Sequence, residues 1–119
     1  MICEGDNSVC EMKCVVYKVV CVSCEEFYIG ETARPLWKRM DEHVRALRNP
    51  QSYPDNPFSK HHTLKHTREP PPQLRFSIFH KNLADPVERK IKEALEIKHW
   101  EPPINNREEM KYAMSLITL

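Results

Sequence analysis

All five cysteines of this chain lie within its first 24 residues, and this clustering constrains the fold more than any other feature. An odd number of cysteines, with no secretory signal before them, argues against a disulfide framework and favours metal binding or free thiols. Two of them form Cys21-x-x-Cys24, the spacing of a zinc knuckle. The other three are Cys3, Cys10 and Cys14.

The Cys-x-x-Cys segment lies between two segments that have the composition of strands. Residues 15–20 are mostly β-branched and aromatic, and residues 27–30 continue this pattern after a gap of six residues. Such a gap predicts a hairpin with the cysteines in its loop. Alternating apolar and polar residues over 74–79 predict a third strand.

Helices are predicted between and after these strands. The first begins near Pro35, a short second one covers 58–66, and the third begins with Asp85 as N-cap and Pro86 in the first turn. We expect the first helix to bury Leu36, Met40, His43 and Leu47, with Trp37 and Val44 widening that face. The third is expected to bury Val87, Ile91, Ala94 and Leu95, with Ile97 at the margin and Glu93 at the border, and to end at Pro102-Pro103. The predicted fold class is α+β, a small three-stranded antiparallel sheet flanked by helices.

The length of 119 residues predicts one domain. We expect an N-terminal extension over 1–13, a folded domain over 14–110 and a C-terminal tail over 111–119. No apolar run approaches the roughly 20 residues needed to span a bilayer. The first residues lack the basic and apolar regions of a secretory signal. The sequence therefore predicts an intracellular protein, nuclear or cytoplasmic, that is not secreted and has no membrane partner.

The charge of the chain is unevenly distributed, although its formal net charge is only +1. Residues 34–75 contain nine basic and four acidic residues, together with four of the six histidines. A basic stretch of this kind suits a phosphate backbone, and it equally suits a solvated helix face.

Several short motifs occur in an order that resembles one nuclease family. They are Val15-Val16-Tyr17, Tyr28-Ile29-Gly30 with Thr32, Leu36-x-x-Arg39-x-x-x-His43, Glu93 on a late helix and Asn105. This arrangement resembles GIY-YIG nucleases over about Cys14 to Met110, although Val15 and Val16 replace the glycine and isoleucine of the first triplet. The inserted cysteine pair resembles a narrower group, the endonuclease domain of Penelope-like retroelements.

The resemblance implies a metal-dependent DNA endonuclease that hydrolyses a phosphodiester bond and nicks DNA during retroelement mobility. The catalytic residues it implies are Tyr17, Tyr28, Arg39, His43, Glu93 and Asn105. Glu93 is expected to hold one Mg²⁺ or Mn²⁺ ion, because hard cations prefer carboxylate oxygens. The residues expected to contact the DNA are Gly30, Thr32, Arg34 and Lys38. A tyrosine with a pKa near 10 is a poor base at neutral pH, so help from a neighbour is required. His43, one turn after Arg39, could take or hand over a proton near neutrality.

A second, structural ion is expected at the cysteine pair. Tetrahedral zinc needs two more ligands, and His66 with either His61 or His62 provides them. His61 is preferred because similar sequences have a gap of four residues there. Cys3, Cys10 and Cys14 are either the remnant of an upstream knuckle or reduced thiols, and we favour reduced thiols.

Two other functions remain open at this level. One is a catalytically inactive nuclease-like module that binds nucleic acid or protein, and the other is a zinc-stabilised adaptor. The joint presence of all six catalytic residues favours an active enzyme. Since the chain has no room for a reverse transcriptase, we expect a fragment linked to one in a longer parent protein, a decayed copy or a domesticated gene.

Overall fold

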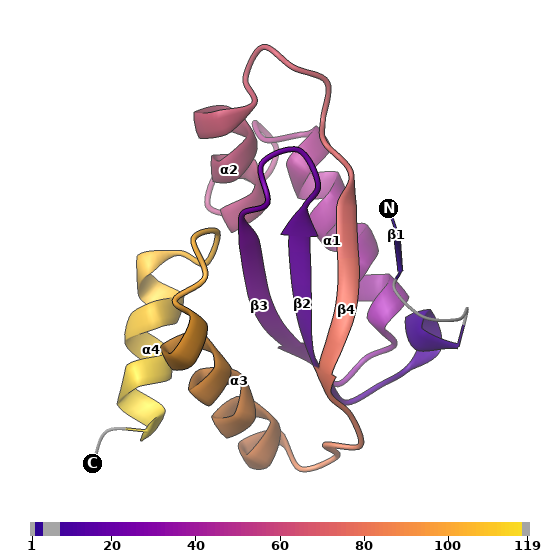
Figure 1. Cartoon of the computed structure of the whole chain (residues 1–119), viewed down its shortest axis with the longest axis vertical. Helices are drawn as coiled ribbons and strands as arrows, with labels where there is room; N and C mark the ends of the chain where they lie inside the picture. Colours follow the sequence, from indigo (N-terminus) through magenta and orange to yellow (C-terminus); the bar gives the residue numbers. More distant parts are fainter. Residues whose placement is uncertain (1, 4–7, 118–119) are drawn as a thin grey trace.

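The computed structural model describes residues 2–3 and 8–117, and it places a sheet between two pairs of helices (Figure 1). The strands are β1 (Ile2–Cys3), β2 (Val15–Cys21), β3 (Phe27–Thr32) and β4 (Leu74–His80). The helices are a 3-10 turn (Val9–Glu11), α1 (Leu36–Arg48), α2 (Pro57–Lys65), α3 (Pro86–Trp100) and α4 (Arg107–Ile117).

The sheet confirms the predicted fold class. Its strand order is β1-β4-β2-β3, and β2 pairs in an antiparallel manner with both β3 and β4. The register places Tyr17 opposite Gly30, and Val19 opposite Tyr28. The short β1, which was not predicted, pairs in parallel with β4. The strand β3 is therefore left at one edge of the sheet.

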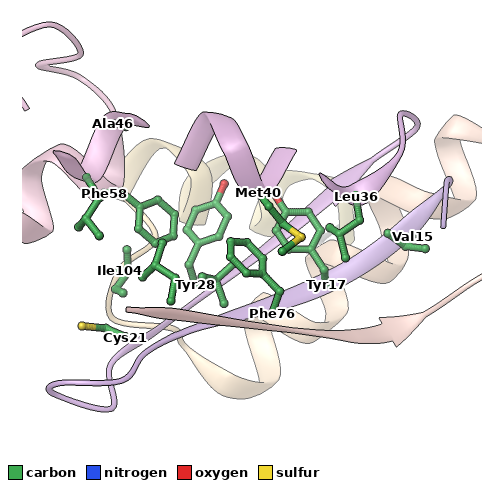
Figure 2. Packing of buried hydrophobic residues seen from close by; sticks show 13 residues of the cluster. Val15, Tyr17, Cys21, Tyr28, Leu36, Met40, Ala46, Phe58, Phe76 and Ile104 are labelled. Carbon is green, nitrogen blue, oxygen red and sulfur yellow. The ribbon is translucent and has the colours of Figure 1, made fainter. Parts of the chain in front are cut away.

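The two faces of the sheet bury different sets of side chains. One face packs Val15, Tyr17, Val19 and Cys21 of β2 against α1 and α2. Figure 2 shows this cluster, with Tyr28 beside Phe58 and with Tyr17 beneath Met40 and Leu36. On the other face, Val16 and Ile29 pack against α3 and α4. This alternation is the period of two that a β-strand imposes.

The predicted buried faces of the helices are partly wrong. In α1 the four expected residues Leu36, Met40, His43 and Leu47 are buried and Val44 is half-buried, but Trp37 is 49% exposed. In α3 the Asp85 cap is confirmed, because its side chain accepts a hydrogen bond from the Val87 N–H.

The buried residues of α3 are Arg89, Ala94 and Ile97, whereas the predicted Val87, Ile91 and Leu95 are exposed. The side chain of Arg89 lies beneath the helix, where its Nε donates to Glu31 Oε2 at 2.5 Å. A paired charged residue therefore occupies part of the buried face that apolar periodicity assigned to other residues.

The helix α4 was not predicted and crosses the boundary expected at residue 110. It packs through Ala113, which is buried beside Ala94 and Ile97 of α3. Residues 1 and 4–7 of the expected extension and residues 118–119 of the expected tail lie outside the described residues. Among the helices of the described residues, none has the length and apolarity to cross a membrane.

Candidate functional site

Two clusters of functional side chains lie on the face of β2 that packs against α1 and α2. The first contains Cys21, Cys24, His61 and His66, whose ligand atoms all lie within 4.8 Å of one another. Cys21 ends β2 and Cys24 follows in the hairpin loop, while α2 and its C-cap provide the histidines. The four residues could hold a metal ion, and they are the four that the sequence predicts.

The hydrogen bonds of this cluster fix the orientation of both imidazole rings. Nε2 of His61 lies 3.5 Å from Cys24 Sγ, and Nε2 of His66 lies 3.6 Å from Cys21 Sγ. The opposite ring nitrogens face carboxylates, with His61 Nδ1 at 3.3 Å from Glu26 and His66 Nδ1 at 3.0 Å from Glu69. A carboxylate behind each histidine keeps the proton on Nδ1 and leaves the Nε2 lone pair for a metal.

The alternative ligand His62 lies outside the cluster. Both of its ring nitrogens are buried without a hydrogen-bond partner among the described residues, and the ring lines a groove beside α2. Burial lowers the pKa of His61, so the ring is neutral and able to bind a cation. Burial and the neighbouring Cys21 raise the pKa of the Cys24 thiol, a cost that a divalent cation removes.

The second cluster begins with Tyr17 and His43. The Tyr17 hydroxyl and His43 Nε2 are 2.7 Å apart in a buried hydrogen bond, and His43 Nδ1 has no partner among the described residues. Burial raises the pKa of Tyr17 well above its ordinary value, although Arg39 opposes the shift. Burial, with Arg39, lowers the pKa of His43. Both groups are therefore neutral near pH 7.

Gly30 accommodates the Tyr17 ring. A Cβ atom at this position would lie 2.5 Å from the Tyr17 hydroxyl oxygen and 2.8 Å from Cε1 of Tyr28. These separations are far below van der Waals contact, so only glycine fits. Gly30 was expected to let a phosphate approach the backbone, but the space above it is filled by the tyrosine.

Tyr28 and Glu109 form the side of the cluster nearest α4. The Tyr28 hydroxyl donates a hydrogen bond to Glu109 Oε2 at 2.7 Å. The ring lies 6.4 Å from that of Tyr17 and 5.2 Å from that of His43. Burial raises the pKa of Tyr28, and so do the neighbouring Tyr17 and Glu109.

Glu93 belongs to α3 and lies close enough to this cluster for its pKa to respond to the cluster's charges. Burial raises its pKa to about 8, and the negative charges of Glu31 and Glu109 add to the shift, while Lys90 and Arg39 oppose it. Arg39 of α1 is the common neighbour, since its charge also acts on Tyr17, Tyr28 and His43. The cluster thus brings together side chains from β2, β3, α1, α3 and α4.

The remaining predicted residues have other contacts. Thr32 is buried and its hydroxyl accepts a hydrogen bond from the Arg34 N–H. Arg34 forms an exposed ion pair with Glu42, and the exposed Lys38 lies over the Trp37 ring.

Asn105 pairs with the backbone of β3, because its Oδ1 accepts from the Ile29 N–H and its Nδ2 donates to the Ile29 carbonyl, both at 2.9 Å. Asn105 therefore binds the backbone of β3 next to Tyr28, and these two bonds use one amide hydrogen and one lone pair of its side chain.

A groove of about 330 Å³ runs beside Asn105, between α2 and the segment that precedes α4. Three basic side chains line it, Lys60, Lys65 and Arg107. Lys65 pairs with Glu26, whereas Lys60 and Arg107 form no ion pair among the described residues. The groove shares Asn106 with the cap of α4, so it lies next to the Tyr28–Glu109 pair.

Three residues near the cluster were missed by sequence reasoning: Glu31, Arg89 and Glu109. The Glu31–Arg89 pair joins β3 to α3 and depends on tertiary packing, so no local pattern indicates it. Glu109 had a detectable signal, because Asn106-x-x-Glu109 is a capping box that predicts a helix start.

Comparison of the chain with family models, with curated proteins and with solved structures gave no match.

Proposed function

We propose that this chain is a metal-dependent endonuclease that hydrolyses a phosphodiester bond of DNA. The observation that carries the proposal is the position of Arg39, whose charge acts on Tyr17, Tyr28, His43 and Glu93 together. Phosphodiester hydrolysis needs a group that binds the phosphate, a proton acceptor and stabilisation of the developing charge. The cluster contains a candidate for each.

The order of burial supports different roles for these side chains. The side chain of Arg39 is 33% exposed and Glu93 is half-buried, whereas Tyr17 and His43 lie underneath. Arg39 binds the phosphate oxygens through its planar guanidinium. With its proton on Nδ1, His43 accepts the hydrogen bond of Tyr17 through Nε2, and its neutral ring is the candidate proton acceptor. Tyr28 lies between this pair and Glu109 and orients the attacking water.

Glu93 is the residue that would hold the catalytic cation. A hard divalent cation such as Mg²⁺ supplies charge stabilisation at the phosphate when it is bound. The raised pKa of Glu93 supports this role, because a carboxylate next to Glu31 and Glu109 ionises at lower cost when a cation offsets the three charges.

The Cys21–Cys24–His61–His66 cluster is proposed as a structural zinc site. Tetrahedral zinc with Zn–S near 2.3 Å and Zn–N near 2.05 Å gives an S···N separation of about 3.6 Å. The two measured separations are 3.5 and 3.6 Å. All four positions are protein ligands, which leaves none for a substrate water and favours a structural role over a catalytic one.

The DNA is expected to approach along the edge formed by β3. The groove beside Asn105 continues from the cluster and offers Lys60 and Arg107 to phosphate oxygens. Neither cation forms an ion pair within the described part of the chain, so their charge is available to the DNA backbone. A longer parent protein with a reverse transcriptase is consistent with such a nicking domain and belongs to the same proposal.

The test is nicking of supercoiled plasmid with and without Mg²⁺, comparing Arg39→Ala with Arg45→Ala. Arg45 is a matched control on the same helix, because it is exposed and pairs with Asp41, the residue one helical turn before it. We expect Mg²⁺-dependent nicking by the wild type and the control, and a loss of at least about 100-fold in Arg39→Ala. Absence of wild-type nicking, or full activity of Arg39→Ala, would contradict the proposal.

A further inference from the structure

Glu109 has both of its carboxylate oxygens fixed by different partners. Oε1 accepts a hydrogen bond from the Asn106 N–H at 3.0 Å, and the Asn106 side chain accepts from the Glu109 N–H at 2.8 Å. This reciprocal pair is a capping box at the start of α4. The other oxygen, Oε2, accepts from the Tyr28 hydroxyl at 2.7 Å. The carboxylate is therefore held in one orientation by the helix end.

This arrangement decides where the phenolic proton of Tyr28 points. Tyr28 is 4% exposed, and its ring is packed 5.2 Å from both His43 and Phe58. A hydroxyl has one proton to donate and two lone pairs to accept with. Because the proton is directed to Glu109, the lone pairs of the Tyr28 oxygen remain available to a water molecule.

We propose that Glu109 is a positioning residue for the nuclease reaction, which holds the Tyr28 proton so that the phenol oxygen faces the attacking water as an acceptor. The inference rests on the proposed function and deepens it, because it makes α4 part of the active site. Glu109 is not among the residues that the resemblance to GIY-YIG nucleases implies.

The charged and titratable groups around this pair come from every neighbouring element. They are Tyr17 from β2, Glu31 from β3, Arg39 and His43 from α1, and Glu93 from α3. Glu109 is the acidic group in direct hydrogen-bond contact with Tyr28, and its charge adds to burial in raising the pKa of that phenol. Removal of the Glu109 charge therefore lowers the pKa of Tyr28.

The discriminating variant is Glu109→Gln. Glutamine also serves in a capping box, so its carbonyl oxygen keeps the bond to the Asn106 N–H and α4 stays folded. Its amide nitrogen then faces Tyr28 and donates to the phenol oxygen, which reverses the hydrogen bond. Glu108→Gln is the matched control, since Glu108 is the exposed neighbour in the same helical turn.

The experiment measures plasmid nicking and the ¹³Cζ resonance of Tyr28 in protein labelled at tyrosine, assigned with Tyr28→Phe. We expect Glu109→Gln to lower kcat by about 100-fold, the effect of a misplaced reacting group, with KM for DNA and the melting temperature unchanged. The Tyr28 resonance should shift and its titration should move to lower pH, whereas Glu108→Gln should match the wild type.

The outcomes separate this inference from the proposed function. If the wild type nicks DNA and Glu109→Gln nicks equally well, Glu109 does not position Tyr28 and the inference is overturned. An unchanged Tyr28 resonance in Glu109→Gln overturns it as well. If the wild type does not nick DNA at all, the proposed function fails, and the positioning role fails with it.

Discussion

Two clusters begin on the same face of β2, yet they differ in kind. The Cys–His cluster consists of Cys21, Cys24, His61 and His66. The Tyr–Arg–Glu cluster consists of Tyr17, Tyr28, Arg39, His43, Glu93 and Glu109. Tyr17 and Cys21 are four residues apart, roughly 13 Å along a strand. The Cys–His cluster has four side chains that could hold one metal ion, and each of its histidines faces a carboxylate. The Tyr–Arg–Glu cluster combines neutral, cationic and anionic groups, and its Glu93 has a pKa raised to about 8.

The difference teaches how stability and reactivity are divided in this small domain. The Cys–His cluster joins the hairpin loop to α2, and each of its four side chains has a hydrogen-bond partner within the cluster. The Tyr–Arg–Glu cluster contains the half-buried carboxylate of Glu93 near other carboxylates, and a buried His43 Nδ1 without a partner among the described residues. Such uncompensated groups are unfavourable for folding and are common where chemistry occurs.

The largest expected effect is on the stability supplied by the Cys–His cluster. Cys24→Ser, or a strong chelator, should destabilise the whole domain, because a structural zinc site contributes on the order of 10 kcal/mol. Cys14→Ser is the control, since Cys14 lies outside the cluster. The measurement is zinc content by elemental analysis together with thermal unfolding. If the purified protein contains no zinc and a chelator leaves its melting curve unchanged, this cluster does not bind a structural metal.

The next expected effect is a pH dependence of stability that belongs to Glu93. Its folded-state pKa of about 8 exceeds the ordinary value of 4.5, so the folded state binds the extra proton between these values. Stability contributed by this proton is full below about pH 4.5 and is lost as the pH rises through 8. The difference between the melting temperature of the wild type and that of Glu93→Gln should therefore decrease as the pH rises from 4.5 to 8.

Magnesium should reverse this loss if it binds at Glu93. We expect added Mg²⁺ to raise the melting temperature of the wild type at pH 8, where the carboxylate is ionised in the complex, but not at pH 5. Glu93→Gln should respond at neither pH. Parallel Mg²⁺ responses in the two proteins would show that the cation binds elsewhere.

A smaller effect is expected from Gly30→Ala, in which the new methyl group would collide with Tyr17 at 2.5 Å. Overpacking of this kind costs about 1–3 kcal/mol. Tyr17→Leu removes both the hydroxyl oxygen and Cζ of Tyr17, the two atoms nearest to the new methyl group, so the double variant should be more stable than the sum of the two single changes predicts. Chemical denaturation of the four proteins measures this coupling, and strict additivity would contradict the contact.

The smallest effect concerns the groove that continues from the Tyr–Arg–Glu cluster. Lys60→Ala and Arg107→Ala should each weaken DNA binding at low salt and reduce the salt-dependence slope by about one. Lys98→Ala is the control, because Lys98 is an exposed cation of α3 that does not line the groove. Fluorescence anisotropy at several salt concentrations measures both quantities. Equal slopes for all three variants would place the DNA on another surface.

The sequence predicts the two clusters to different extents, for a physical reason. Cys21-x-x-Cys24 and His61-x4-His66 are local patterns, and only the closure of the intervening chain has to be inferred. The pairing of the two strands that contain Tyr17 and Tyr28 is also local, since a short hairpin joins these strands. These elements were predicted and are present.

The parts that were missed depend on contacts between distant elements. The buried face of α3 contains Arg89, which pairs with Glu31 of β3, whereas the apolar stripe Val87, Ile91 and Leu95 is exposed. The helix α4 runs from the expected folded domain into the expected tail, and Glu109 contacts Tyr28 across 81 positions of the chain. Periodicity within one segment contains no information about such partners.

The central claim is that two ions serve two separate sites, one for folding and one for DNA cleavage. Nicking of supercoiled plasmid by wild type and by Glu93→Gln, at equal measured zinc content and in the presence of Mg²⁺, tests it most directly. We expect the wild type to nick and Glu93→Gln to be inactive while its zinc content is unchanged. Nicking by zinc-loaded Glu93→Gln at the wild-type rate would contradict the claim.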